Sequence, residues 1–484
     1  MNKDEKIDRV VTPVLVSKIT SKDTLKKQKA DRGFKIRENH SEKILNYLAN
    51  LVRALSGKLE VLKADDWPNL LRYLEKNLHI ENLEVNIFGR RGEQNSPIIA
   101  NVSCGDFLYK PSVSFSSNEA ISKSIGSFLE HEALKVKKED LRASIEALKD
   151  KGKDFLNPNK LAGFSKEQIE KRMDLHHGDR APISWTLGEN ISTNTTSFIP
   201  SQLIFSNYDI HLENDEIDPF LRESNSYTAS GMFDYDSALL RSLRKAIVND
   251  AFLIHWLNFL TPQRVKIGSI EDVFIREIIS NLKKQSLKVS ILDISTEDVG
   301  IPVYASVIIK NNGVSNFVSV GLGCAGSAIK AIRYSLMKSL SSHYIFEPNI
   351  FSPGKLDKEN FDETERILFW SNLDDLNKID WFLKGEEKDI KELESSKSSI
   401  ESPIEELKTI KKRLRDMGNE YEIYVYFASE KFLKGVNYVV LKTIVPALVP
   451  LYLKEKNITL GASRLMGVSE KSKFPNTIPH PILR

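Results

Sequence analysis

Three helical segments align on an alanine. After it, they place mostly charged or polar residues at matching positions along one face. The aligned sets are Ala120, Ala238 and Ala331, then seven residues later Ser127, Lys245 and Lys338, then three residues later Glu130, Val248 and Ser341. Residues at these spacings share a helix face. Lysine attracts phosphate as a point charge, and a carboxylate supplies oxygen ligands to a hard cation. The positions therefore suggest phosphate or metal chemistry.

Two glycine-containing phrases precede the second and third of these helices. TASGMF and GLGCAG invite comparison with phosphate-binding loops, but neither matches a full Walker or dinucleotide fingerprint. Glycine also permits close strand-to-helix turns, because it carries no side chain. We therefore expect both phrases to be strand endings rather than phosphate loops.

The elements that must position these residues repeat one plan: a small-residue strand, a turn and an amphipathic helix. Between the second and third units, the runs LKVSILDIS and IPVYASVII favour adjacent strands, because apolar β-branched residues suit sheet positions. The later run VVLKTIVPALVPLYL favours a buried strand followed by a loop, since a lysine and two prolines interrupt it. Together these patterns predict an α/β fold of the α+β type, with repeated strand-turn-helix units around mixed sheets.

Changes of pattern divide the chain into a preface and a main domain. Residues 1–84 combine a lysine-rich start with the helical patterns SEKILNYLANLVRAL and WPNLLRYLEKNL, which predict a helical preface. This preface could be a cap, a partner-docking element or a peptide-binding appendage. Residues 85–484 form the predicted main domain, with a charged helical region at 350–421 and a proline-containing tail at 472–484.

The composition limits the function classes that remain. The 484 residues carry a formal net charge of only +3, which gives no overall basic footprint for nucleic acid. No apolar run is long enough to span a bilayer, and the N-terminus lacks a signal-peptide pattern, so we expect a cytoplasmic protein without a membrane partner. Cys104 and Cys324 form no CxxC pair and are predicted to be buried thiols.

The order of these motifs resembles the YcaO family over residues 85–484. Members of that family use ATP to activate peptide backbone amides. Their equivalent helix faces carry mostly glutamates, which hold magnesium and, through it, the nucleotide phosphates. The resemblance implies a YcaO-like fold, and Ser230 and Gly231 retain part of the family's strand pattern.

This chain departs from the family pattern on all three helices. The family has a serine, two glutamates and an arginine on the first helix, two glutamates and an arginine on the second, and a glutamate and a glutamine on the third. Those places are occupied here, in chain order, by Lys123, Ser127, Glu130 and His131, then by Lys245, Val248 and Asn249, and then by Lys338 and Ser341. Only Glu130 keeps an acid, so it is the single candidate metal ligand.

Lysine in place of a liganding glutamate repels a magnesium ion. Two unit charges about 4 Å apart interact by roughly 4 kcal/mol at an effective dielectric of about 20. We therefore expect no cofactor; the alternative is ATP and magnesium, with Lys123, Lys245 and Lys338 neutralising phosphate. Without a nucleotide, the lysines would pair with Glu130 or reach solvent. His131 is expected to be packed or hydrogen-bonded, and a general base is the alternative.

The C-terminal sequence FPNTIPHPILR resembles the tail of azoline-forming YcaO proteins, in which alternating prolines place the final residues into the active site. Pro479 and Pro481 fit that pattern and would position the tail. Ile482, Leu483 and Arg484 replace the expected final prolines. The alternative is an extended, frayed tail, since proline favours polyproline geometry without any enzymatic role.

A retained scaffold with lost carboxylates predicts a non-catalytic YcaO-like subunit in the biosynthesis of a ribosomally made, modified peptide. It would help to position the precursor peptide for an active YcaO or a leader-binding partner, within a homodimer or heterodimer. One alternative is an ATP-dependent cyclodehydratase that forms an azoline from Cys, Ser or Thr. The other is a peptide-binding scaffold, for which residues 1–84 are the region to delete.

Overall fold

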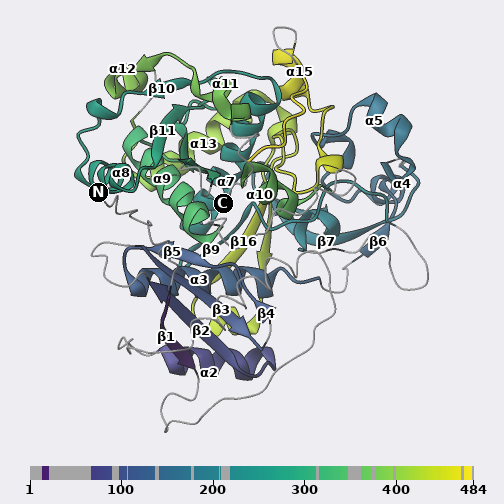
Figure 1. Ribbon diagram of the computed structural model, residues 1–484. Helices are drawn as coiled ribbons and strands as arrows, with labels where there is room; N and C mark the ends of the chain where they lie inside the picture. The colour runs from purple at the N-terminus through teal and green to yellow at the C-terminus, as the bar shows by residue number, and fades with distance from the viewer. Residues whose placement is uncertain are drawn as a thin grey trace, which may run out of the picture. The chain divides into compact units, whose positions relative to one another are not determined.

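The computed structural model divides the chain into two units, Met1–Phe128 and Leu129–Arg484 (Figure 1). The residues it describes are 14–20, 67–89, 97–105, 107–136, 141–175, 179–206, 208, 218–311, 316–346, 361–371, 377–395, 399–469 and 474–481. Among the helices in these ranges, none combines the length and the apolar content needed to cross a bilayer.

The first unit is built around a five-stranded antiparallel sheet. Its elements are β1 (Val14–Thr20), α2 (Trp67–Leu78), β2 (Leu83–Gly89), β3 (Ile98–Cys104), β4 (Phe107–Leu108) and β5 (Ser112–Ser114). The strand order is β1-β2-β3-β4, and β5 also pairs with β3. Helix α2 lies against β1 and β2 and buries Leu71 and Leu74 completely, so its apolar side faces the core of this unit (Figure 1).

The predicted boundary between residues 84 and 85 lies within strand β2. Strand β2 is hydrogen-bonded to β1 on one side and to β3 on the other, which makes it a central strand of one continuous sheet. The preface also contains a strand, β1, in addition to the predicted helix α2. The other helical pattern, at residues 41–55, lies outside the described residues. The division between the units lies within α3 (Ser117–Ala133).

One sheet of the second unit contains two predicted strands side by side. Its members are β10 (Gln263–Val265), β11 (Lys288–Asp293), β12 (Val303–Asn311), β13 (Asn316–Cys324) and β14 (Glu387–Lys388). The order is β13-β12-β11-β10-β14, antiparallel except between β10 and β14. Ile291 of β11 lies opposite Ser306 of β12, which confirms that LKVSILDIS and IPVYASVII form adjacent strands.

The other sheet of the second unit carries the strand that precedes α7 (Tyr235–Leu257). Its members are β6 (Leu141–Ala143), β7 (Ile183–Asn190), β8 (Thr195–Pro200), β9 (Ala229–Met232), β15 (Tyr424–Ala428) and β16 (Val439–Ile444). The order is β6-β7-β15-β16-β9, with β8 paired to β7. Strand β16 is followed by an irregular segment through Pro450, as predicted. Helix α7 contacts β9 and β16 of this sheet and β13 of the other, so it joins the two sheets in one core.

The remaining helices of the second unit surround this core (Figure 1). They are α4 (Ile145–Asp150), α5 (Lys166–Lys171), α6 (Ser201–Ile204), α8 (Val273–Lys284), α9 (Ala328–Ile345), α10 (Glu363–Ser371), α11 (Asp380–Leu383), α12 (Ile390–Ser395), α13 (Pro403–Met417), α14 (Lys431–Gly435) and α15 (Ser463–Ser469). Ser402 caps α13 by accepting a hydrogen bond from Glu405 N, and the helix ends at Gly418. The described part of region 350–421 is mostly helical, as predicted.

The three repeated units have the predicted order of strand, turn and helix. Helix α3 follows β5, α7 follows β9, and α9 follows β13. The alanines on which the units align, Ala120, Ala238 and Ala331, are all fully buried. The α+β prediction is therefore confirmed, and each helix buries the alanine on which its unit aligns.

The glycines of GLGCAG hold a strand and a helix in close contact. A β-carbon at Gly321 would lie 2.1 Å from Ser335 O, and one at Gly323 would lie 2.0 Å from Ala331 O. Any larger residue would force α9 away from β13. These glycines therefore serve strand-to-helix packing, as predicted, and not a phosphate loop.

Candidate functional site

The carboxylate of Glu130 lies among basic groups at the end of β9. Its Oε1 accepts a hydrogen bond of 2.8 Å from Gly231 N and lies 3.7 Å from Arg241 Nη1. Its Oε2 lies 3.6 Å from Lys245 Nζ. The side chain of Glu130 is 12% exposed, so these contacts satisfy a carboxylate that is largely removed from water.

Lys245 extends from α7 to the backbone of the same strand. Its ammonium donates a hydrogen bond to Ala229 O, while the side chain keeps 21% exposure. Burial lowers the pKa of Lys245 to about 8, although the neighbouring charge of Glu130 acts in the opposite direction. The contact between Lys245 and Glu130 is the pairing that the sequence predicts for a lysine when no nucleotide is bound.

Lys338 occupies the equivalent position on α9 and is partly buried. Burial, and then the positive charges of Lys245 and Arg241, lower its pKa to about 7. Within the described residues, Lys338 makes no hydrogen bond and no ion pair. The structure therefore brings the lysines of the second and third repeats within electrostatic reach of each other, but gives a carboxylate partner only to Lys245.

Two positions of the first repeat make contacts with other residues of their own helix. Lys123 forms an ion pair of 2.6 Å with Glu119, one turn earlier on α3. His131 Nδ1 lies 3.4 Å from Glu132 Oε1, and the ring is partly exposed. Lys123 and Ser127 belong to the first unit, whereas Glu130 and His131 belong to the second.

The other predicted positions are polar groups on β9, α7 and α9. Ser230 is fully buried, and its hydroxyl has no hydrogen-bond partner among the described residues. Ser230 lies opposite Leu441 of β16, so both side chains share the sheet face that packs toward α7. Asn249 and Ser341 are partly buried, and neither makes a side-chain hydrogen bond within the described part of the chain.

Arg241 also belongs to this cluster, and the sequence did not predict it. Its Nη1 donates a hydrogen bond of 3.1 Å to Gly231 O and approaches Glu130. It stands four residues before Lys245 on α7, and residues at this spacing are neighbours on one helix face. That spacing is the sequence signal that places Arg241 beside Lys245.

The cluster does not fit a magnesium ion. Magnesium requires several oxygen ligands in octahedral geometry, but this cluster supplies one carboxylate and two lysines and an arginine around it. Both oxygens of Glu130 already face N–H donors or an ammonium. Across the described residues, no group of three or more His, Cys, Asp or Glu side chains could hold a metal ion.

The described part of the C-terminal tail is held by buried indole groups. Trp256 Nε1 donates a hydrogen bond of 2.9 Å to Ile478 O, and Trp370 Nε1 donates one of 3.1 Å to Pro479 O. Asn476 Nδ2 donates in return to Trp256 O at 3.0 Å. These bonds fix the tail main chain against the C-terminal half of α7 and against α10.

The side chain of His480 and the ring of Pro481 are also buried. Arg366 Nη1 donates a hydrogen bond of 3.3 Å to His480 O, and His480 Nε2 lies 3.1 Å from Tyr452 O. The alternative of a frayed tail does not hold for residues 474–481, because buried donors bind its carbonyl groups. Positioning of the tail for catalysis by Pro479 and Pro481 stays a prediction, and residues 482–484 lie outside the described range.

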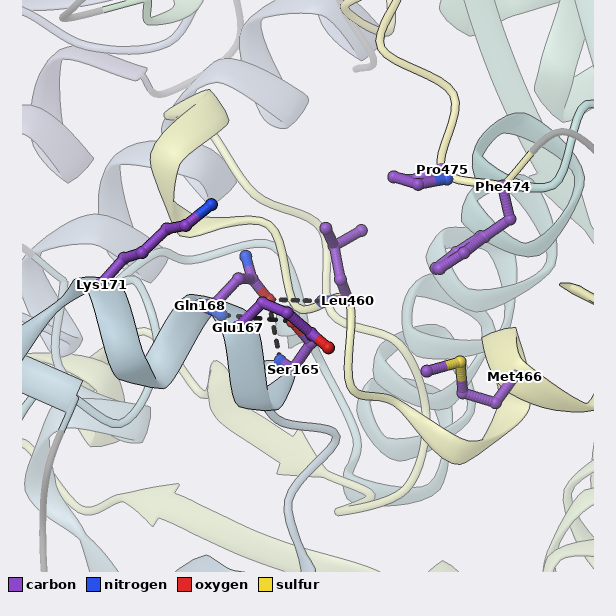
Figure 2. Close-up of a pocket in the computed structure, with 8 residues that line it drawn as sticks. All are labelled: Ser165, Glu167, Gln168, Lys171, Leu460, Met466, Phe474 and Pro475. Atoms are coloured by element: carbon purple, nitrogen blue, oxygen red, sulfur yellow. Dashed lines mark hydrogen bonds between the residues drawn. The ribbon is translucent and has the colours of Figure 1, made fainter.

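Two cavities lie along this tail, and neither is lined by Glu130 or Lys245. One, of about 280 Å³, has Gln168 and Lys171 of α5 on one side and Phe474 and Pro475 on the other (Figure 2). Figure 2 also shows Gln168 hydrogen-bonded to the backbone of the Leu460 segment, which fixes that wall. The other cavity, of about 420 Å³, shares Leu460 and Pro475 with the first.

The family model described as YcaO cyclodehydratase, ATP- and Mg²⁺-binding, matches residues 114–449, more than half of the chain. The chain belongs to the YcaO family. No curated protein sequence matches it. The matched range contains Glu130, Lys245 and Lys338, so these residues lie inside the YcaO domain itself.

Solved structures share the fold of this YcaO chain. A heterocyclase in complex with substrate and cofactor has a TM-score of 0.65 at 14% identity, over 85% of this chain and 57% of that one. The E. coli microcin synthetase McbBCD complex with pro-MccB17 bound has a TM-score of 0.55 at 15% identity, over 78% of this chain and 95% of that one. YcaO from Methanopyrus kandleri, bound with AMPPCP and Mg²⁺, has a TM-score of 0.50 at 13% identity, over 83% and 88%.

These likenesses confirm the predicted YcaO-like fold. This chain spans 57% of the substrate-bound heterocyclase and 50% of the heterocyclase TruD, so it is shorter than either. The family description names ATP and magnesium, whereas the cluster around Glu130 does not fit magnesium. This YcaO chain therefore combines the family fold with basic residues around Glu130.

Proposed function

We propose that this YcaO chain is a degenerate, non-catalytic subunit of a complex that modifies a ribosomally synthesised precursor peptide. The observation that carries the proposal is the environment of Glu130, whose oxygens face Gly231 N, Arg241 and Lys245. A carboxylate in these contacts is a partner for cations of the protein and is a poor ligand for magnesium. Its scaffold, in contrast, keeps the strand-turn-helix repeats and the packed tail.

The partner in this proposal is an active YcaO protein or a leader-binding protein in the cytoplasm. This chain would form a heterodimer with that partner, or bind it as a homodimer. The similarity to the McbBCD complex with pro-MccB17 supports a role beside a peptide and other proteins, since the likeness covers 95% of the matched chain. The partner would supply the ATP chemistry, and this chain would help to position the precursor.

The test is precursor modification in a reconstituted complex, measured by mass spectrometry. The complex consists of this chain, a candidate precursor peptide and a candidate active YcaO partner. Omitting this chain is expected to slow modification or alter the set of modified residues, and adding the Glu130→Gln variant is expected to restore both. An unchanged rate and an unchanged site pattern without this chain would contradict the subunit role.

A second candidate is an ATP-dependent cyclodehydratase that forms an azoline from Cys, Ser or Thr. The observation in its favour is that Lys245 and Lys338 place positive charge where the family binds nucleotide phosphates. Precursor-dependent ATP hydrolysis by the purified chain would support this candidate. Lack of ATP binding and of hydrolysis, with precursor and partner present, would exclude it.

A further inference from the structure

The C-terminal tail carries a buried histidine whose two ring nitrogens both face main-chain carbonyl groups. His480 is only 3% exposed. Its Nδ1 lies 2.7 Å from Pro481 O, and its Nε2 lies 3.1 Å from Tyr452 O. A neutral imidazole has one N–H, so it can donate to only one of these two oxygens. An imidazolium would donate to both, but its charge would then have to be stabilised inside the protein.

The surroundings of the ring oppose that charge. Arg366 of α10 donates from Nη1 to His480 O at 3.3 Å, so a guanidinium is fixed beside the same residue. Helix α7 presents the ring of Phe252, and Tyr452 presents its own ring, with its hydroxyl kept neutral because burial raises its pKa well above the usual range. Burial, and then the positive charge of Arg366, lower the pKa of His480 well below its usual range, although the two carbonyl contacts act in the opposite direction. The docked tail therefore holds a neutral imidazole at neutral pH.

The carboxylates of this region are bound to other partners. Glu455 Oε1 lies 2.5 Å from Arg366 Nη1, and Glu223 accepts hydrogen bonds from main-chain N–H groups of the segment that follows Tyr452. Within the part of the chain that the structure describes, neither carboxylate hydrogen-bonds to the imidazole. A proton on docked His480 would thus lie beside Arg366 without a carboxylate partner.

Release of the tail would free the imidazole from these surroundings. A histidine in water titrates near pH 6.5, so below about this pH a released tail takes up a proton while the docked tail does not. Acid therefore favours the released tail, because that state binds more protons. We propose that His480 is an acid-sensitive latch, which holds the C-terminal tail against α7 and α10 at neutral pH and releases it when the imidazole is protonated. This property belongs to the isolated chain and does not depend on the proposed subunit role.

Release of the tail would also remove the two cavities that lie along it. Phe474 and Pro475 form one side of the first cavity (Figure 2). Pro475, Thr477 and Pro479 belong to the lining of the second. The tail is thus a wall of both cavities, so both exist in their present form only while the tail is docked.

Hydrogen exchange of the full-length chain, followed by mass spectrometry between about pH 7.5 and about pH 5, tests the proposal. Asn476 N donates to Leu257 O at 2.8 Å, so the protection of this amide reports docking of the tail. After correction for the intrinsic exchange rate, protection of the tail should fall about thirtyfold over this range, because only the released tail is protonated. The β12–β13 hairpin is the internal reference. Tail protection that is constant relative to this hairpin, or that rises toward pH 5, would overturn the proposal.

Two substitutions assign the effect to His480. His480→Gln keeps a side-chain N–H donor but does not titrate, so its tail protection should change less than about twofold with pH. His79→Gln removes an exposed histidine of the first unit and should keep the full pH dependence. Full pH dependence in His480→Gln would contradict the assignment.

The onset of the wild-type change gives a separate readout, which decides if His480→Gln releases the tail already at neutral pH. Titration of the released histidine should make protection begin to fall near pH 6.5. An onset below about pH 5 would assign the change to carboxylates and would contradict the latch.

Discussion

The two halves of helix α7 contrast within one continuous element. The N-terminal half carries Arg241 and Lys245, whose cationic groups are partly exposed and approach one carboxylate. The C-terminal half carries Asp250, Phe252 and Trp256, which are fully buried in the core. The C-terminal half builds the buried core, and the N-terminal half presents two cations to Glu130. One helix can therefore serve packing at one end and carry partly exposed charge at the other.

The largest expected effect is loss of the ion pair in the buried half. Asp250 accepts from Val449 N at 2.9 Å and lies 2.7 Å from Arg464 Nη2, whose guanidinium also contacts Asp298. Asp250→Ala leaves that arginine largely buried with one carboxylate fewer, which should lower the free energy of unfolding by about 3–5 kcal/mol in urea denaturation.

The matched control for this substitution is Asp416→Ala. Asp416 is exposed in the last turn of α13. Its removal should change the free energy of unfolding by less than about 0.5 kcal/mol. If Asp250→Ala changed the free energy of unfolding as little as this control, the buried ion pair of α7 would contribute no more to stability than an exposed residue does.

A second prediction concerns Lys442, a buried lysine of β16 in the scaffold. Its ammonium donates to Ile204 O and Asn225 O, and burial lowers its pKa to about 7. The unfolded lysine titrates near pH 10.4, so between about pH 7 and about pH 10 the unfolded chain holds more protons than the folded chain. Stability should therefore rise with pH in this window. Lys442→Met should remove about 2 kcal/mol of the rise between about pH 7 and about pH 9.

Urea denaturation at both pH values measures this difference. Lys412→Met, which removes an exposed lysine, should keep the full pH dependence. An identical pH dependence in Lys442→Met and the wild type would show that Lys442 titrates normally in the folded protein.

The third prediction tests the anchoring of the tail. Trp370→Phe removes the indole donor to Pro479 O and leaves that carbonyl without this bond. The local cost should be about 1 kcal/mol, so hydrogen exchange at Thr477 and Ile478 should become several-fold faster. Exchange in the β12–β13 hairpin is the internal reference and should not change. Unchanged exchange in the tail would mean that the indole bond does not hold it.

The smallest effect is expected at Lys338 on α9, beside the exposed half of α7. Lys338→Met removes a partly buried cation that faces Lys245 and Arg241. Relief of this repulsion should leave the free energy of unfolding unchanged or raise it by up to about 1 kcal/mol. Urea denaturation at neutral pH gives the value. A loss of several kcal/mol would show that Lys338 is a structural residue of the scaffold.

Local sequence signals predicted the framework of the site well. The alanines at the helix entries, the apolar spacing and the preceding strands gave the register of α7 and α9, because each reports packing within one repeat. Lys245 and Lys338 lie on these two helices. Strand β1 was missed, since its pairing with β2 joins segments that are far apart in sequence.

The contacts that escaped prediction depend on distant partners. Arg241 lies beside Glu130 because both side chains bond to the main chain of Gly231 in β9. The tail is anchored by Trp256 and Trp370, which stand more than a hundred residues earlier in the chain and show no pattern that pairs them with it. Helical periodicity indicates which face is buried, but it does not identify the groups that meet there.

The most direct test of the central claim is precursor-dependent ATP hydrolysis by the reconstituted complex in which this chain carries Glu130→Gln. If Glu130 is a partner of Arg241 and Lys245 and no ligand of magnesium, the complex should hydrolyse ATP at the wild-type rate. The purified chain alone should hydrolyse none. Loss of hydrolysis in an assembled complex containing folded Glu130→Gln would contradict this account and would place the catalytic metal on this chain.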